Sequence, residues 1–251
     1  MKAEKIFEAL CNMAPLSLAL SYDNAGFLLG DMQTEVTKAV VCLDATLNVV
    51  EYAQKEGAQL IISHHPIIFE PLKSITAQEN SRIYKCLASG ISVISMHTNM
   101  DSAVGGVNDC LAEALGLSNI SPIEDSEGFS FRKGTLSEKM SADGLARFVK
   151  SRLGGVVRYT DSGKLISTVA VCGGSGGDFY RLAEESGADA LVTADVKHSY
   201  FIGAADRGFT LIDAGHFHTE NTVVEPLAKR LSEKITSVEF LPFNLREIKT
   251  V

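Results

Sequence analysis

Short apolar runs rich in β-branched residues alternate with helix-like stretches, and this alternation most constrains how the chain can fold. The runs KAVVCLDAT, AQLIISHH and ISVISMHT are separated by LNVVEYAQKEG and ENSRIYKCLASG, and VNDCLAEALG follows them. Strands that alternate with helices of this length are typical of βαβ units and a largely parallel sheet. We therefore expect an α/β fold.

The same alternation continues after residue 128. GFSFRKGTL, VVRYT, STVAVCGG, DALVTAD and FTLIDAG have strand character, Ser141 opens a predicted helix, and VVEPLAKRLSEK and TSVEFLPF close the chain. The polar stretch at 118–128 indicates a loop between two halves. The sequence thus predicts two α/β domains of similar size with mostly parallel sheets, over 1–122 and 123–251. The C-terminal segment belongs to the second domain or packs back on the first.

Composition and charge exclude several classes of protein. The chain has 251 residues, of which 45% are hydrophobic and 22% charged, with a formal net charge of −8. That charge argues against a nonspecific binder of nucleic acid or of an anionic membrane. No apolar run approaches the roughly 20 residues of a membrane span, and charged residues near the N-terminus favour an amphipathic helix over a signal peptide. The five cysteines include no CxxC pair, so we expect reduced thiols in a cytoplasmic protein.

Four of the six histidines directly follow predicted strands. His64 and His65 end the run LIISHH, His97 ends ISVISMH, and His216 follows TLIDAG. The carboxyl ends of parallel strands gather at one edge of a sheet, where α/β proteins place their ligands. Both rings of the double histidine are therefore expected to turn into one crevice. The alternative is a pair of hydrogen-bonded histidines that cap a loop.

The cluster SMHTNMDSAVGGVND adds a carboxylate to the imidazoles. In an extended segment His97, Asn99 and Asp101 would share one face. An imidazole and a carboxylate together suit zinc, iron or manganese. Asp101 is alternatively a cap of the helix that follows it.

The cluster DAGHFHTEN also combines histidine with a carboxylate. On one helical turn His216 and Glu220 would share a face, and His218 would point elsewhere. In an extended segment His216 and His218 would pair, and Glu220 would join them. A solvated turn is the remaining alternative. Together the three clusters hold more ligand-type residues than one tetrahedral ion can use, which favours two ions bridged by a carboxylate.

The motifs of this chain resemble those of the GTP cyclohydrolase 1 type 2 homologs, also called Ngg-interacting-factor-3-like proteins. The resemblance rests on SYDNAGFLLGD, SHHPIIF, HTNMDSAVGGVND, VCGGSGG, TADVKH and DAGHFHTE, which occur in the same order. It implies a dinuclear divalent-metal site in the cleft between the two α/β halves and a toroidal homohexamer. The metal ligands that it implies are His64, His65, Asp101, His216 and Glu220, with His97 beside the site.

Two divalent ions lower the pKa of a shared water, so such a site suits a hydrolase. The resemblance implies a GTP cyclohydrolase-like enzyme that acts on a nucleotide-like substrate, with His97 or His198 as candidate for moving protons. The alternative is a non-enzymatic protein that stores, delivers or senses metal ions, or a regulatory scaffold.

The segment VCGGSGGDFY has the glycines of an anion-binding loop between a strand and a helix. It lacks the Lys-Ser/Thr pair of a P-loop and the spacing of a dinucleotide fingerprint. The alternative is a tight turn in which Asp178 caps the helix.

Overall fold

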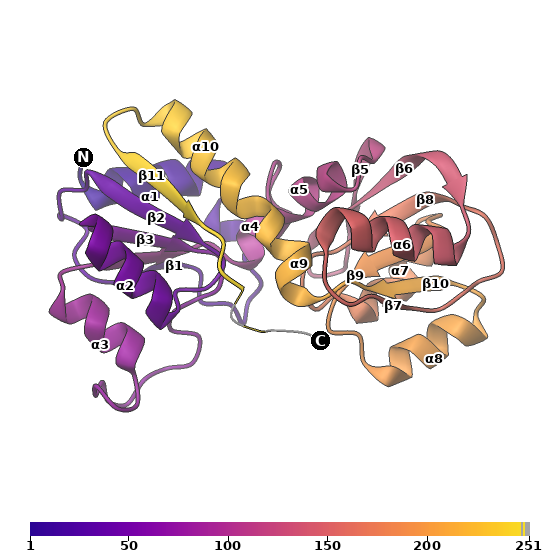
Figure 1. The fold of residues 1–251 in the computed structure, drawn as a ribbon, viewed down its shortest axis with the longest axis horizontal. Helices are drawn as coiled ribbons and strands as arrows, with labels where there is room; N and C mark the ends of the chain where they lie inside the picture. The colour runs from indigo at the N-terminus through magenta and orange to yellow at the C-terminus, as the bar shows by residue number, and fades with distance from the viewer. Residues whose placement is uncertain (247, 249–251) are drawn as a thin grey trace. The chain divides into compact units, whose positions relative to one another are not determined.

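The computed structural model describes residues 1–246 and residue 248, and it contains two compact units (Figure 1). The first unit comprises Met1–Val104 and Val224–Leu245, and the second comprises Gly105–Val223 together with Arg246. This division differs from the predicted one at 122/123. The chain enters the second unit earlier, and its last helix and strand belong to the first unit.

The first unit is built on a five-stranded sheet with the order β1-β4-β3-β2-β11. Strands β4, β3, β2 and β11 pair in parallel, and β1 pairs antiparallel with β4 at the edge. The strands are β1 (Gly26–Leu29), β2 (Lys38–Cys42), β3 (Leu60–Ser63), β4 (Ser92–Ser95) and β11 (Glu239–Phe243). The helices are α1 (Ala3–Met13), η1 (Leu16–Leu18), α2 (Leu47–Glu56), α3 (Ser81–Ala88), α4 (Thr98–Ser102) and α10 (Val224–Lys234). The mostly parallel sheet predicted for the first half is confirmed.

Local sequence explains where the helices of this unit begin and end. Thr46 caps α2, because its side chain accepts a hydrogen bond from the Val49 amide (3.3 Å). Gly57 ends the same helix in the left-handed conformation, with φ of 66°. Helix α1 buries Ile6 and Leu10 on one face, which confirms the predicted amphipathic helix. Among helices of the described residues, none combines the length and the apolar character that a bilayer crossing demands.

The second unit contains a six-stranded sheet with the order β5-β6-β8-β9-β10-β7. Its strands are β5 (Ser118–Glu124), β6 (Ser130–Met140), β7 (Arg158–Tyr159), β8 (Ile166–Val171), β9 (Ala190–Thr193) and β10 (Thr210–Asp213). Its helices are α5 (Val107–Ala114), α6 (Ala142–Leu153), η2 (Gly177–Phe179), α7 (Tyr180–Glu185), α8 (His198–Asp206), α9 (His216–Glu220) and η3 (Asn221–Val223). Strands β8, β9 and β10 are parallel, whereas β5, β6 and β7 pair antiparallel with their neighbours. This sheet is therefore mixed rather than mostly parallel.

The polar stretch at 118–128 is a strand followed by a turn, and the prediction of a loop there was wrong. Residues Ser118–Glu124 form β5, which pairs with β6 across a short turn. A turn of that length can join only antiparallel strands. Most of β5 is exposed and Ile123 alone of its residues is buried, as an edge strand permits, so its polar composition resembled that of a loop.

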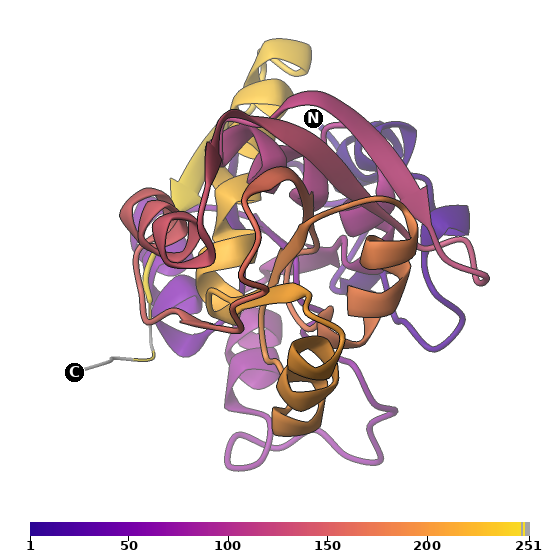
Figure 2. The same ribbon diagram turned by 90° about the vertical axis from the view of Figure 1, so that its right-hand side faces the viewer.

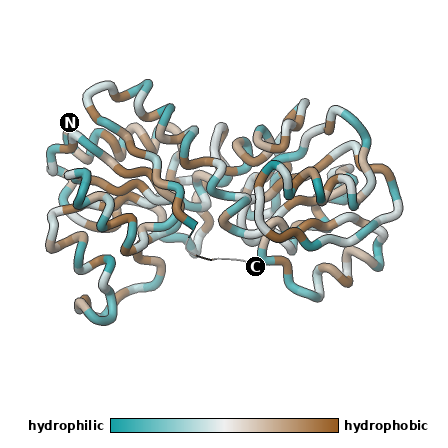
Figure 3. The backbone as a smooth tube through the Cα atoms, viewed as in Figure 1, coloured by the Kyte–Doolittle hydropathy of each residue, from teal (hydrophilic) through white to brown (hydrophobic). Residues whose placement is uncertain are grey.

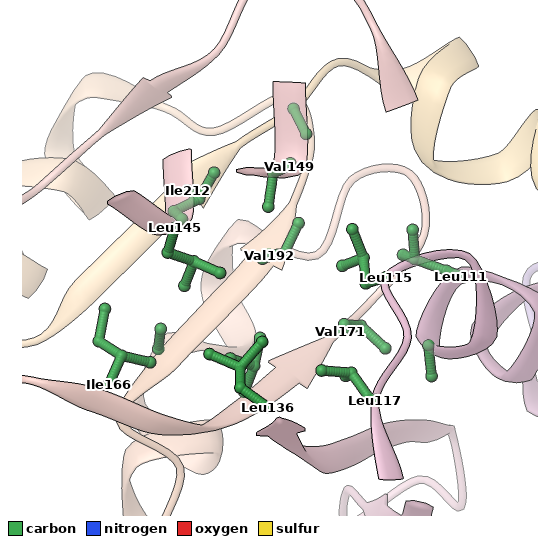
Figure 4. Close-up of a cluster of buried hydrophobic side chains, with 14 of the residues drawn as sticks. Leu111, Leu115, Leu117, Leu136, Leu145, Val149, Ile166, Val171, Val192 and Ile212 are labelled. Carbon is green, nitrogen blue, oxygen red and sulfur yellow. The ribbon is translucent and has the colours of Figure 1, made fainter. Parts of the chain in front are cut away.

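The core of the second unit lies between α6 and the sheet. Leu145 and Val149 of α6 pack with Val171, Val192 and Ile212 from three parallel strands (Figure 4). Helices α6 and α7 lie on opposite sides of this sheet (Figure 2). Hydrophobic segments of the backbone coincide with the strands in each unit (Figure 3), so the alternation in the sequence corresponds to buried strands and amphipathic helices.

The register of the parallel strands fixes which residues lie together at each sheet edge. In the first unit Cys42, Ser63 and Ser95 are aligned at the carboxyl ends of β2, β3 and β4. In the second unit Thr193 is aligned with Asp213 at the ends of β9 and β10. The segments that follow these residues carry the predicted ligands.

Candidate metal-binding groups

The double histidine is held at the carboxyl end of β3 by the neighbouring strand. The amide of His64 donates to the carbonyl of Cys42 (3.1 Å), and that of His65 to the carbonyl of Leu43 (2.9 Å). The ring centroids of His64 and His65 are 5.0 Å apart, and His97 lies 5.2 and 5.7 Å from them. One nitrogen from each of the three rings lies within 4.8 Å of the other two. The rings therefore turn to one side, as predicted, and form a cluster that could hold a metal ion.

Each of these rings is oriented by a hydrogen bond between Nδ1 and an oxygen. The oxygens belong to the Met96 carbonyl for His64 (2.9 Å), Asp44 for His65 (2.7 Å) and Asp23 for His97 (2.8 Å). A carbonyl or carboxylate oxygen only accepts, so Nδ1 donates and carries the hydrogen. In a neutral ring the lone pair is then on Nε2, the atom that is left to bind a metal or a proton.

Asp101 lies beside this cluster, but on a helix and not on the extended segment that we predicted. The amides of Met100 and Asp101 donate to the carbonyl of His97 (2.7 and 3.1 Å), which starts α4. Asp101 is buried, and its Oδ1 lies 3.6 Å from Nε2 of His64. The helical turn brings residues four apart to one side, so His97 and Asp101 stay together although the predicted conformation was wrong.

The same turn separates Asn99 from the cluster. Its side-chain amide donates to the carbonyl of Ala14 (2.8 Å), at the end of α1. The alternative role of Asp101 as a cap of the next helix is also not observed, because Gly106 occupies the N-cap of α5.

Asp23 is the buried partner of His97, and its role was missed in the sequence. Its Oδ1 accepts from Nδ1 of His97, and its Oδ2 accepts from the amide (3.0 Å) and hydroxyl (2.6 Å) of Thr98. Burial alone would raise the pKa of Asp23, but the hydrogen bonds from His97 and Thr98 outweigh burial and lower that pKa to about 2. The carboxylate therefore stays charged and fixes the orientation of the His97 ring.

In the second unit His216 and Glu220 begin and end α9. Nε2 of His216 lies 2.9 Å from Oε2 of the buried Glu220, and Nδ1 lies 2.6 Å from Oδ2 of Asp195. The helical alternative for this segment is thus confirmed. Asp195 has a φ of 49°, a left-handed conformation that few residues other than glycine adopt and that aspartate tolerates better than most.

His218 and His198 are not brought to this pair. Nδ1 of His218 donates to the carbonyl of Leu153 (2.8 Å), and its Nε2 lies 3.0 Å from Nη1 of Arg246. His198 is the exposed first residue of α8. Within residues 1–246, the ring of His198 makes no hydrogen bond or ion pair with His216.

The glycine-rich loop after β8 is shaped by packing around Glu220. A Cβ added to Gly174 would lie 2.0 Å from Oε1 of Glu220, and one added to Gly176 would lie 2.5 Å from Sγ of Cys172. The amides of Gly173, Gly174 and Gly176 already donate to side chains, namely those of Asn108 (2.8 Å), Thr219 (3.1 Å) and Thr193 (2.9 Å). These contacts account for the glycines without a bound anion. Asp178 lies within η2 and is not the cap of a helix, because the N-cap positions of η2 and α7 are Gly176 and Phe179.

The structure therefore brings the predicted ligands together in two groups. His64, His65 and Asp101 lie with His97 in the first unit, and His216 lies with Glu220 in the second. Sequence reasoning missed the three carboxylates that orient the rings, those of Asp23, Asp44 and Asp195. Asp44 and Asp195 each lie two residues beyond the end of a parallel strand, a signal that could have identified them.

Comparison with known proteins places the chain among close relatives over its whole length. The sequence model of the family described as Duf34/NIF3 (NGG1p interacting factor 3) matches residues 1–247. A protein of Clostridium perfringens named GTP cyclohydrolase 1 type 2 homolog is 33% identical over 251 residues, which cover 96% of this chain and 95% of that protein. The crystal structure of a hypothetical protein of Staphylococcus aureus superposes with a TM-score of 0.93 at 30% identity, over 100% of this chain and 99% of that one. The "reduced HcgD" structure from Methanocaldococcus jannaschii has a TM-score of 0.84 at 29% identity, over 98% of each chain.

Replacement of Gly174 should disturb Glu220 beyond the cost of backbone strain. Gly174 and Gly163 have φ of 60° and 69°, and nothing lies within 4 Å of a Cβ added to Gly163. Gly163→Ala should therefore cost about 1 kcal/mol of unfolding free energy from its conformation alone. Gly174→Ala should cost roughly 1–3 kcal/mol more, because the methyl group overlaps the Glu220 carboxylate. Urea denaturation of both variants measures the difference, and equal losses would show that the close approach to Glu220 is unimportant.

The hydrogen bonds to Asp23 should make stability depend on pH in acid. The folded pKa of about 2 lies below the ordinary aspartate value of 3.8, so the ionised carboxylate contributes stability above pH 4 that is lost as pH falls to 2. The contribution should be about 2 kcal/mol. Urea denaturation of EDTA-treated protein between pH 5 and 2.5 should show this loss in the wild type and not in Asp23→Asn. Asp143→Asn, at an exposed ion pair with Arg147, is the control and should follow the wild type. Parallel pH profiles for wild type and Asp23→Asn would contradict the role of the Asp23 carboxylate.

Proposed function

Because the chain belongs to the DUF34/NIF3 family, we propose that it is a divalent-metal-binding protein. The observation that carries this proposal is the common state of the candidate imidazoles. In His64, His65 and His216, Nδ1 donates to a carbonyl or carboxylate oxygen, which directs Nε2 towards a ligand. Metal-ligating histidines are almost always held in this way, since the partner fixes the tautomer and raises the basicity of the ring.

The proposed centre holds two ions, and both units contribute ligands to it. The proposed ligands number five, one more than a tetrahedral ion takes: His64, His65, Asp101, His216 and Glu220. The His216–Glu220 pair supplies only two donors and would leave a tetrahedral ion incomplete. A carboxylate that bridges two ions makes use of the whole set. Nitrogen and oxygen donors of this kind suit zinc, iron or manganese.

We propose a metal-dependent hydrolase that acts on a nucleotide-like substrate, in keeping with the name of the relatives. Two divalent ions, when bound, lower the pKa of a water towards neutrality. His97 is then the better candidate for moving a proton. Its Nδ1–H is held by the buried Asp23, which leaves Nε2 to accept a proton, as in the oriented histidines of catalytic triads. His198 is exposed, and among the residues that the structure describes no partner holds its ring in this way.

The proposal extends to location and assembly. A cytoplasmic location is supported by the five cysteines, which form no disulfide. The toroidal homohexamer is supported by the resemblance of the motifs.

Metal analysis of the purified chain tests the proposed centre. We expect close to two transition-metal ions per chain in the wild type, and fewer in His64→Ala and in Glu220→Ala, because each variant removes a donor from a different unit. His198→Ala is the control, since it removes an exposed imidazole and should keep the wild-type content. Metal absent after reconstitution, or unchanged in both ligand variants, would contradict the proposed centre.

Hydrolysis is tested separately on the metal-loaded protein with a panel of nucleotides. His97→Gln should lower the turnover rate about 10²–10⁴-fold, the usual contribution of a general base, and should keep the metal content of the wild type. A lower rate in His198→Ala would instead assign the proton transfer to His198. A loaded wild type with no turnover on any nucleotide would favour the alternative of metal delivery or regulation.

A further inference from the structure

Asp213 has a buried carboxylate that none of the roles described so far explains. It is the last residue of β10 and is 6% exposed. Its Oδ1 accepts from the amide of Gly215 (3.1 Å), and its Oδ2 accepts from the amide of Val196 (3.1 Å) and from Nη2 of Arg158 (2.5 Å). Three donors therefore surround one carboxylate.

The two amides belong to the segments that carry the His216 ring and its partner. Val196 directly follows Asp195, and Gly215 directly precedes His216. Asp213 thus joins the loop after β9 to the start of α9. The hydrogen bond between Nδ1 of His216 and Oδ2 of Asp195 spans these same two segments, at 2.6 Å. Its length depends on how the two segments are held.

We propose that Asp213 is a positioning residue for His216 and that it acts through Asp195. This inference rests on the proposed metal-binding function, in which His216 is a ligand. Asp195 has a left-handed backbone, which costs free energy in a residue other than glycine. Such a conformation persists only where the surrounding structure fixes it. The hydrogen bond from the Val196 amide fixes the peptide that follows Asp195, and the bond from Gly215 fixes the approach to His216.

The charge of Asp213 is matched by Arg158 of β7. The guanidinium of Arg158 also donates to the carbonyl of Val196 (3.3 Å) and lies 5.2 Å from the ring centroid of Phe201. An asparagine at position 213 would have one accepting oxygen and one donating NH₂ group, so it could not accept from all three donors. Asp213→Asn should therefore loosen the two segments and leave the volume unchanged.

Asp189 provides a matched control in the same sheet. Its Oδ2 accepts from the amides of Ser167 and Thr168 (2.8 and 2.9 Å). It directly precedes β9, so it lies at the amino ends of the parallel strands, whereas Asp213 lies at their carboxyl ends. Asp189→Asn removes a comparable carboxylate from two backbone amides without touching the segments of Asp195 and His216.

The experiment compares the Kd for Zn²⁺, measured by competition with a chromophoric chelator, in the full-length wild type and its variants. Loss of the partner of a metal-ligating histidine typically weakens metal binding about 10–100-fold, which we expect for Asp195→Asn. Asp213→Asn should weaken binding about tenfold. Asp189→Asn should keep the wild-type Kd. Since Asp213 acts through Asp195, the double variant Asp195→Asn/Asp213→Asn should bind no more weakly than Asp195→Asn.

Each outcome separates this inference from the proposed function. A wild-type Kd in Asp213→Asn, equal weakening in Asp189→Asn, or additive losses in the double variant would overturn the positioning role while metal binding stands. A wild type that binds no Zn²⁺ would overturn both. Should Asp213→Asn fail to fold, Arg158→Gln removes the guanidinium that holds both Oδ2 of Asp213 and the carbonyl of Val196, the residue after Asp195. It should weaken Zn²⁺ binding, and an unchanged Kd would contradict the role of this pair.

Discussion

A hydrogen bond from Nδ1 to an oxygen is the interaction on which the candidate site depends. It recurs in His64, His65, His97 and His216, with a backbone carbonyl in the first and carboxylates in the others. A free imidazole exchanges tautomers and rotates, so it presents either nitrogen. When Nδ1 donates a hydrogen bond to a fixed oxygen, the ring cannot rotate freely and Nε2 points in one direction. The site is therefore ordered by its supporting oxygens before any ligand arrives.

The oxygens are available because both sheets align strand ends. Asp44 and the Met96 carbonyl follow β2 and β4, on either side of the strand that leads to His64 and His65. In the second unit Asp195 and His216 follow adjacent strands in the same way. Parallel pairing thus brings together residues that are 21 to 32 apart in the sequence. Core packing of apolar strands and orientation of polar side chains are two results of one topology.

Most strands of the fold, and the histidines that follow them, were predictable from the sequence. In these segments the apolar sequence pattern agrees with the burial that the structure shows. The strands Leu60–Ser63 and Ser92–Ser95 are buried along their whole length, and a histidine follows each of them within two residues. The parts that could not be predicted depend on contacts distant in sequence. The segment at 118–124 is a strand because β6 pairs with it, and Asp23 is recognised only through His97, 74 residues away. The expectation that His97 and Asp101 lie on one side did not depend on the conformation of their segment. Residues four apart share a face in an extended segment and also lie one turn apart in a helix.

The glycine-rich loop after β8 resembles an anion-binding loop in sequence, but its glycines have another physical cause. Glycines after a strand are expected where a backbone must approach a ligand closely. Here the group that approaches is Glu220 of the same chain, and loop amides donate to Asn108, Thr193 and Thr219. The loop therefore holds the segment of one candidate ligand, as Asp213 holds that of another. Residues that are not proposed ligands, the loop glycines and Asp213, thus hold the segments that carry Glu220 and His216.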